Sequence, residues 1–229
     1  MIALVRFLVA GYLWSARVLQ PLIVIALIVV VVLLQGPGGP DAAEPAVGTL
    51  GDVAAFMFPV WAWAARGLLD TQPDEQRALS ATAVGRRWVA VGAGLLAAYG
   101  VNLALGMIAL LVPLLQAVLA GVPVTAVLTG CGLSALVAAA GTLLGAWTSR
   151  AIIPNPGLSL PALLGGAVAV LLLGIGRLAW LSVPMIAWLR SAHGGPGAFV
   201  DGFPGVALHL VLWSAVVGGA YVAAARVRV

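Results

Sequence analysis

Few side chains in this sequence are of a type that carries out chemistry. His193 and His209 stand apart from any glutamate or cysteine, so they cannot form a zinc-binding H-E-x-x-H motif. The single cysteine, Cys131, has no second thiol with which to form a disulfide or a metal site. The absence of lysine excludes a Walker A loop and a Schiff-base mechanism on lysine. We therefore expect no enzyme, and no metal or cofactor held by this chain.

The charged residues are scarce, and their placement indicates a membrane. The sequence is 8% charged and 63% hydrophobic, with a mean hydropathy of +1.15, whereas soluble domains are about 25% charged. All 11 basic residues are arginines at the edges of apolar runs, without a basic stripe or interleaved aromatic rings, which argues against nucleic-acid binding. Arginine without lysine, with much alanine, glycine and valine, is typical of a GC-rich bacterial genome. We expect a protein of the bacterial plasma (inner) membrane, in contact with membrane lipid.

The apolar runs predict an all-α integral membrane fold with six transmembrane helices in one transmembrane domain, 1–229. A bilayer crossing needs about 20 mainly apolar residues. The predicted spans are 18–35, 50–69, 88–112, 122–147, 158–175 and 206–225. The first is too long for a signal peptide and lacks a cleavage site, so we interpret it as a retained helix. The third is expected to break at Pro113.

Two further segments are expected outside the six spans. Residues 1–17 carry two arginines, a tyrosine and a tryptophan, so they predict a helix lying along the membrane surface. Residues 177–205 contain an apolar run too short to cross, followed by glycine and proline clusters. They predict a re-entrant or interfacial helix and then a loop on the outer side.

The arginines also predict the orientation of the chain. With six spans and both termini in the cytoplasm, nine arginines lie inside and two, Arg177 and Arg190, lie outside. Five or seven spans would remove this asymmetry. The sequence therefore predicts a multi-pass protein with both termini cytoplasmic.

Mildly polar residues within the third and fourth spans are candidates for a transport pathway. They are Tyr99, Asn102, Thr125, Thr129 and Ser134, together with Thr142. Hydrogen bonds between helices, or back to the helix itself, are the more common role of such residues. In the fourth span, Gly141 and Gly145 form a G-x-x-x-G pattern that permits close helix approach.

The longest polar stretch, residues 70–87, has the signals of a short helix. Thr71 is suited to cap it and Pro73 to its first turn. Acidic side chains at its start and arginines at its end oppose the helix dipole. We predict a cytoplasmic helix between the second and third spans.

This stretch resembles the cytoplasmic helix of the permease subunits of ABC-2-type transporters, which reads roughly E-x-x-x-L-x-A-T-P-V-x-R. The chain has Glu75, Leu79, Ala81, Thr82, Val84 and Arg86 in that register, with Ala83 in place of the usual proline. The surface helix, the six spans and the re-entrant element fit the same family.

The resemblance implies an ATP-driven exporter of a hydrophobic or amphipathic substrate. The cytoplasmic helix would be a coupling helix seated in a separate ABC ATPase subunit, which would bind ATP and Mg²⁺, and a second permease copy would pair with this one. The residues implied to contact the ATPase are Asp74, Glu75, Arg77, Leu79, Ala83 and Arg86.

Three other interpretations remain open. The chain could be the six-span substrate-binding module of an importer, which lacks a coupling helix. It could be a haem-export permease, although no tryptophan-rich haem motif is evident. It could also be a purely structural membrane protein, against which the re-entrant segment argues.

Overall fold

The computed structural model describes residues 1–34, 36, 41–72, 76 and 87–228, and this part of the chain contains helices and no strand. Six of its helices are long and apolar enough to cross a membrane. They are α2 (Leu19–Leu34), α3 (Ala43–Leu69), α5 (Arg87–Leu119), α6 (Val124–Trp147), α7 (Pro156–Ile175) and α9 (Gly195–Arg228). The predicted all-α fold with six helices long and apolar enough to span a membrane is confirmed for the described residues.

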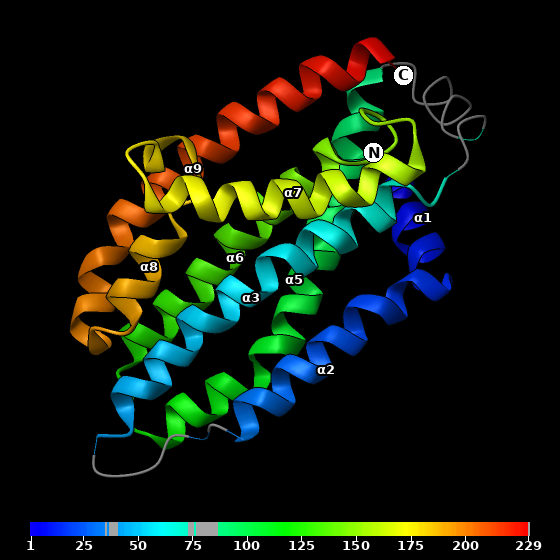
Figure 1. Cartoon of the computed structure of the whole chain (residues 1–229). Helices are drawn as coiled ribbons and strands as arrows, with labels where there is room; N and C mark the ends of the chain where they lie inside the picture. Colours follow the sequence, from blue (N-terminus) through cyan, green and yellow to red (C-terminus); the bar gives the residue numbers. More distant parts are fainter. Residues whose placement is uncertain (35, 37–40, 73–75, 77–86, 229) are drawn as a thin grey trace.

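The most extensive contacts between helices are those of α3 with α6 and α5, and α3 lies at the centre of the bundle (Figure 1). Large side chains along α3, among them Leu50, Phe58 and Trp61, are almost completely buried against α5 and α6. The outer helices differ, because residues such as Ile23 of α2 and Leu212 of α9 remain exposed. Helices that are apolar on their exposed faces require a lipid environment.

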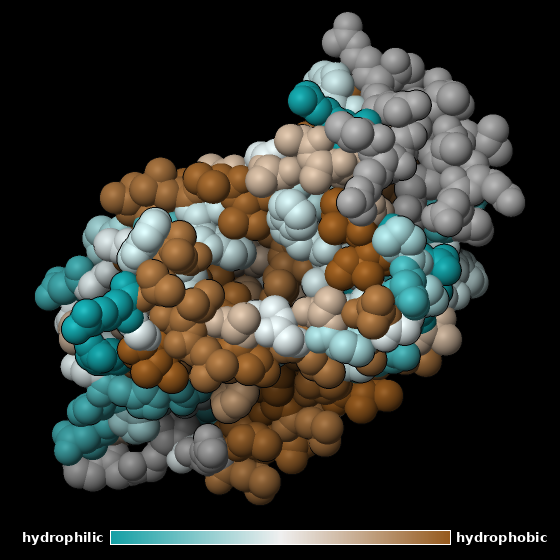
Figure 2. Space-filling model, turned by 45° about the horizontal axis from the view of Figure 1, so that its top comes forward, coloured by the Kyte–Doolittle hydropathy of each residue, from teal (hydrophilic) through white to brown (hydrophobic). Residues whose placement is uncertain are grey.

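The surface has the polarity of a membrane-embedded bundle. Figure 2 shows hydrophobic residues over the middle of one face and hydrophilic residues gathered towards its two ends. The two chain termini lie at the same end of the bundle as the start of α5 (Figure 1). An even number of crossings requires this arrangement of the termini.

Glycines of α6 allow this helix to lie directly on α3. A Cβ added to Gly145 would overlap the carbonyl oxygen of Ala62, and one added to Gly141 would lie 3.0 Å from the Phe58 carbonyl oxygen. One added to Gly130 would lie 2.9 Å from Leu50 Cδ1. The close approach predicted for the G-x-x-x-G pattern is therefore made, and its partner is the central helix.

The first seventeen residues form a short helix and a turn rather than one helix. Helix α1 (Ile2–Leu13) is followed by the 3₁₀ turn η1 (Ala16–Val18). Tyr12 anchors α1, because its ring is completely buried and would lie 3.5 Å from a Cβ added to Gly67 of α3. Burial raises the pKa of Tyr12 to about 12, against a smaller lowering by Arg17, so the phenol stays neutral at physiological pH.

Two of the described helices extend beyond the predicted spans. Helix α3 begins at Ala43 instead of residue 50, since Glu44 and Pro45 are both favourable in a first turn. Helix α5 does not break at Pro113 but runs through it to Leu119. Neighbouring helices can satisfy the backbone groups that a proline frees inside a membrane helix. The chain turns instead at Gly121, whose φ of +72° is in the left-handed region.

The segment before the last span is also more helical than predicted. It consists of the 3₁₀ turn η2 (Ala179–Leu181), helix α8 (Met185–Ala192) and the first turns of α9. The loop expected over 193–205 is wrong, because α9 begins at Gly195 and continues through Pro204. Gly195 makes the turn with a φ of +90°.

Helix α8 is fixed to the beginning of α3. The indole Nε1 of Trp188 donates to the Gly51 carbonyl oxygen at 3.3 Å, and His193 Nε2 lies 2.8 Å from Asp52 Oδ1. A Cβ on Gly51 would lie 2.6 Å from the Ala192 Cβ, so glycine is needed here for close packing. The α8 segment is thereby held at the end of the bundle opposite to the chain termini.

Candidate functional site

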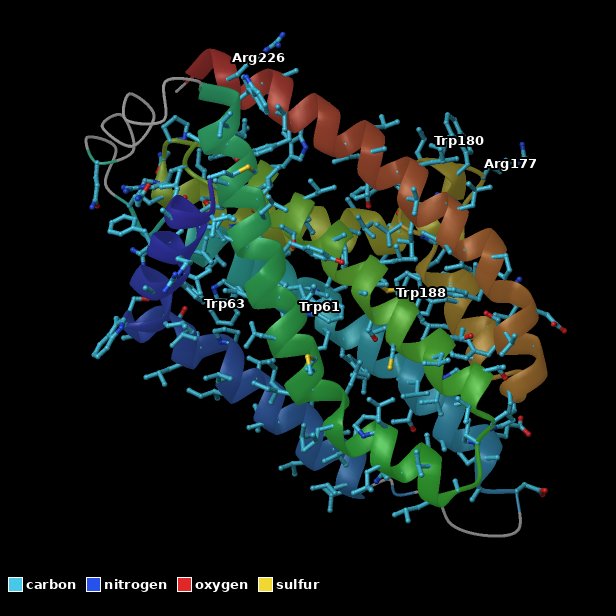
Figure 3. The ribbon with its side chains drawn as sticks, turned by 180° about the vertical axis from the view of Figure 1, so that it is seen from behind. Trp61, Trp63, Arg177, Trp180, Trp188 and Arg226 are labelled. Carbon is cyan, nitrogen blue, oxygen red and sulfur yellow. The ribbon has the colours of Figure 1, made fainter. Side chains whose placement is uncertain are left out.

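An apolar cavity of about 340 Å³ lies between α3, α5 and α6 and is the strongest candidate for a ligand site. Trp61 of α3 forms part of its wall, in the middle of the bundle (Figure 3). The indole packs closely against α5, since a Cβ on Gly106 would lie 3.0 Å from Trp61 Cζ2. The other lining residues are Leu103, Gly106, Met107, Leu110, Leu111, Leu114, Cys131, Ser134, Ala135 and Ala138.

Two polar groups in the wall of this cavity lack a partner. The indole Nε1 of Trp61 and the Oγ of Ser134 are both buried and make no hydrogen bond within the described residues. A buried donor without a partner costs on the order of 1–3 kcal/mol of stability. An apolar wall with two unpaired donors suits an apolar ligand that carries a hydrogen-bond acceptor.

The cavity is not closed off from its surroundings. Met107 and Leu111 line it and are 74% and 70% exposed, respectively. Both residues belong to α5, where exposed apolar side chains face the membrane or another membrane-embedded chain. A hydrophobic molecule could therefore enter from the side of the bundle without crossing water.

Asn102 ties three helices together directly beside Trp61. It is completely buried on α5, and its Nδ2 donates to the Trp61 carbonyl oxygen at 3.0 Å and to Thr142 Oγ1 at 2.9 Å. Thr142 in turn donates to the Ala138 carbonyl oxygen at 2.7 Å. Asn102 Oδ1 has no hydrogen-bond partner in the part of the chain that is described. Asn102 thus positions the backbone that carries Trp61.

Of the predicted pathway residues, Ser134 lines the cavity. The others are not among its lining residues, and three of them form hydrogen bonds between helices or within one helix. The Tyr99 hydroxyl donates to the Ala135 carbonyl oxygen at 3.3 Å, which joins α5 to α6. Thr129 donates back to the Thr125 carbonyl oxygen at 2.8 Å, and Thr125 itself is exposed. The structure therefore does not bring the five residues together in one pathway.

Sequence reasoning missed Trp61 as a cavity residue. Trp61 is one of several aromatic side chains in the apolar run of α3, and no local pattern distinguishes it from the others. Its place in the cavity wall depends on α5 and α6, which supply the other lining residues.

The residues predicted to contact an ATPase, Asp74, Glu75, Arg77, Leu79, Ala83 and Arg86, lie outside the described residues. Asp70 and Gln72 before them are described, as is the start of α5 at Arg87. Within the described residues, no three histidine, cysteine, aspartate or glutamate side chains are grouped to hold a metal ion.

No protein-family model matches the chain, and neither a curated protein nor a solved structure matches it. The resemblance to ABC-2-type permeases therefore rests on the sequence motif and the order of the elements.

Asn102 provides a stability test of the network beside the cavity. Replacing it with leucine removes two interhelical hydrogen bonds, and such bonds contribute about 0.6 kcal/mol on average in a membrane protein. We expect Asn102→Leu to lower the free energy of unfolding by about 1 kcal/mol, measured by denaturant titration in mixed micelles. Thr125→Val is the control and should leave it unchanged, since Thr125 is exposed on α6. Equal stability of the two variants would contradict this role of Asn102.

Proposed function

We propose that this chain is the transmembrane permease subunit of an ATP-driven ABC-2-type exporter. The observation that carries the proposal is the segment with Glu75, Leu79, Ala81, Thr82, Val84 and Arg86 in the family's register. Helix α3 ends at Leu69 and α5 begins at Arg87, so the segment joins two membrane-spanning helices. This is the position that the coupling helix occupies in the family. The chain would not be an enzyme, and ATP and Mg²⁺ would bind to a separate ATPase subunit.

The cavity beside Trp61 supports a hydrophobic or amphipathic substrate. Its lining is mainly leucine, methionine and alanine, with the unpaired donors of Trp61 and Ser134. A second permease copy would pair with this one, and exposed apolar faces such as that of α5 offer surface for the contact. ATP-driven rocking of the two copies would then move the substrate outward.

The proposed orientation places both termini and residues 70–87 in the cytoplasm of a bacterial cell, at the plasma membrane. Helix α1 would lie along the inner surface, and the segment from η2 to the start of α9 would form the re-entrant element at the outer side. The supporting observation is that Arg17, Arg66, Arg150 and Arg226 belong to the bundle end that carries the termini.

Cysteine labelling tests this orientation. In a Cys131→Ser background, single cysteines replace Asp41, Ala78 or Val227, and intact cells are treated with a membrane-impermeant maleimide. We expect Asp41→Cys to be labelled from outside, because Asp41 is exposed in the connection before α3. Ala78→Cys and Val227→Cys should react only after the cells are opened. Labelling of Val227→Cys in intact cells would contradict the six-span orientation.

Purification tests the function itself. The tagged full-length chain is isolated from membranes of its own host in mild detergent, and the proteins that accompany it are identified. We expect an ABC ATPase at a one-to-one ratio with the permease, and ATP hydrolysis that responds to the permease. A binding protein or an importer subunit in place of the ATPase would favour the substrate-binding module.

A further inference from the structure

Four helix ends meet in a pocket of about 320 Å³ at the bundle end that carries the termini. The pocket lies between η1 and the start of α2, the end of α3, the turn after α6 and the start of α7. Its lining residues are Arg17, Gln20, Trp63, Arg66, Gly67, Asp70, Arg150 and Pro156. We call it the arginine pocket.

The arginine pocket has more positive than negative charge in its wall. Three guanidinium groups, those of Arg17, Arg66 and Arg150, accompany one carboxylate, that of Asp70. Arg66 Nε lies 3.7 Å from Asp70 Oδ2, which is an ion pair without a hydrogen bond. Since a single carboxylate cannot neutralise three cations, the described wall favours binding of an anion.

The two remaining arginines, Arg17 and Arg150, are held by hydrogen bonds that do not pair their guanidinium groups with a carboxylate. Arg17 Nη1 donates to the Asp70 and Gly67 carbonyl oxygens at 2.7 and 3.4 Å, and so covers the end of α3. The backbone N–H of Arg150 donates to Asp70 Oδ1 at 2.8 Å. The Arg150 guanidinium itself has no ion pair or hydrogen bond to any other described residue. A fork of guanidinium donors thus remains available at the pocket.

The elements around the pocket favour an anion located at the membrane–water interface. Pro156 of the pocket begins α7, and Asn155 Oδ1 caps this helix by accepting from the Gly157 N–H at 2.9 Å. The N-terminus of α7, which is the positive end of its dipole, therefore lies at the wall of the pocket. The pocket joins ends of four membrane-spanning helices, which is the level of lipid headgroups. Trp63, half-buried in the wall, is a side chain typical of that level.

We propose that the arginine pocket binds a phosphate group at the membrane surface. Guanidinium groups recognise phosphate through paired, charge-assisted hydrogen bonds. The phosphate could belong to an anionic lipid headgroup or to a soluble phosphate compound. Basic pockets between membrane helices bind lipid headgroups in this way. The proposal does not depend on the transport function proposed above.

The test uses the purified full-length chain in a neutral detergent, freed of lipid. Its thermal unfolding is followed while dioleoylphosphatidic acid, dioleoylglycerol or glycerol phosphate is added. The first two have the same acyl chains and differ in the phosphate group. We expect dioleoylphosphatidic acid to raise Tm in a saturable manner by about 5 °C, and dioleoylglycerol to leave it unchanged.

Variants locate the effect in the pocket. Arg150→Gln retains the backbone contact to Asp70 but loses the guanidinium. We expect this variant to need about a tenfold higher concentration of dioleoylphosphatidic acid to reach half of the maximal rise in Tm. Arg150→Lys keeps a positive charge, so its affinity for dioleoylphosphatidic acid should fall less than that of Arg150→Gln. Arg190→Gln, an arginine of α8 at the opposite end of the bundle, is the matched control and should respond as the unmodified chain does.

The two sources are distinguished by glycerol phosphate. Stabilisation by dioleoylphosphatidic acid alone assigns the site to a lipid headgroup, whereas equal stabilisation by glycerol phosphate assigns it to a soluble phosphate compound. The proposal is overturned if dioleoylglycerol stabilises equally, or if Arg150→Gln and Arg66→Gln both keep the full response.

Discussion

Replacing Gly145 with alanine is expected to lower the free energy of unfolding of the bundle by about 3 kcal/mol. The added Cβ would overlap the Ala62 carbonyl oxygen and would lie 2.9 Å from both the Ala65 Cβ and the Arg66 backbone nitrogen. These atoms belong to the main chain of α3 or are attached directly to it, so no side-chain rotation relieves the overlap. Helices α3 and α6 must move apart, which also loosens the wall of the cavity.

The matched control is Gly100→Ala on α5. A Cβ at Gly100 meets nothing within 4 Å, and Gly100 is exposed in the middle of a membrane-spanning helix. Alanine is also a better helix former than glycine by about 1 kcal/mol. We expect Gly100→Ala to unfold at the same denaturant concentration as the unmodified chain, or at a higher one. Similar losses in the two variants would show that Gly145 has no special role in packing.

The number of membrane helices could be predicted from the sequence because hydrophobic length alone determines it. The ends of these helices could not be predicted, since the free-energy cost of a proline inside a helix depends on the neighbouring helices packed against it. Pro113 and Pro204 both lie inside continuous helices, where the short-range pattern predicted a break or a loop. The actual turns occur at Gly121 and Gly195, the two glycines with positive φ among the described residues.

The candidate site was only partly predictable for a different reason. Asn102 was noticed because a polar residue within an apolar run is conspicuous, but its bonds to Trp61 and Thr142 depend on helices 40 residues or more away. The arginine pocket was not expected, because Arg17, Arg66 and Arg150 are far apart in the sequence. Taken singly, each of these arginines has the position of a residue that orients a membrane helix, at the edge of an apolar run.

Replacing Leu79 with aspartate is expected to separate the chain from its ATPase. The sequence pattern predicts a helix over 74–86 with Leu79 and Ala83 one turn apart, on the side that would enter the partner's groove. Truncation of a well-desolvated anchor costs about 2 kcal/mol or more. An unpaired buried charge costs about 3–5 kcal/mol. Together these effects amount to about 5 kcal/mol or more, which corresponds to a loss of binding of more than about a thousandfold.

Two further variants separate coupling from folding. Ala78→Asp places the same charge about 100° around the predicted helix from Leu79, away from the side formed by Leu79 and Ala83, and should leave the complex intact. Glu75→Ala removes a contact at the rim and should weaken the complex less than Leu79→Asp. All three variants should reach the membrane in normal amounts, because residues 75, 78 and 79 lie in the segment between α3 and α5.

The most direct measurement compares copurified ATPase and permease-dependent ATP hydrolysis in the unmodified chain, Leu79→Asp, Glu75→Ala and Ala78→Asp. If the chain is an ABC-2-type permease, Leu79→Asp loses both signals and Ala78→Asp keeps both. If Leu79→Asp and Glu75→Ala leave assembly and hydrolysis unchanged, the segment is not a coupling helix and the proposed function is contradicted.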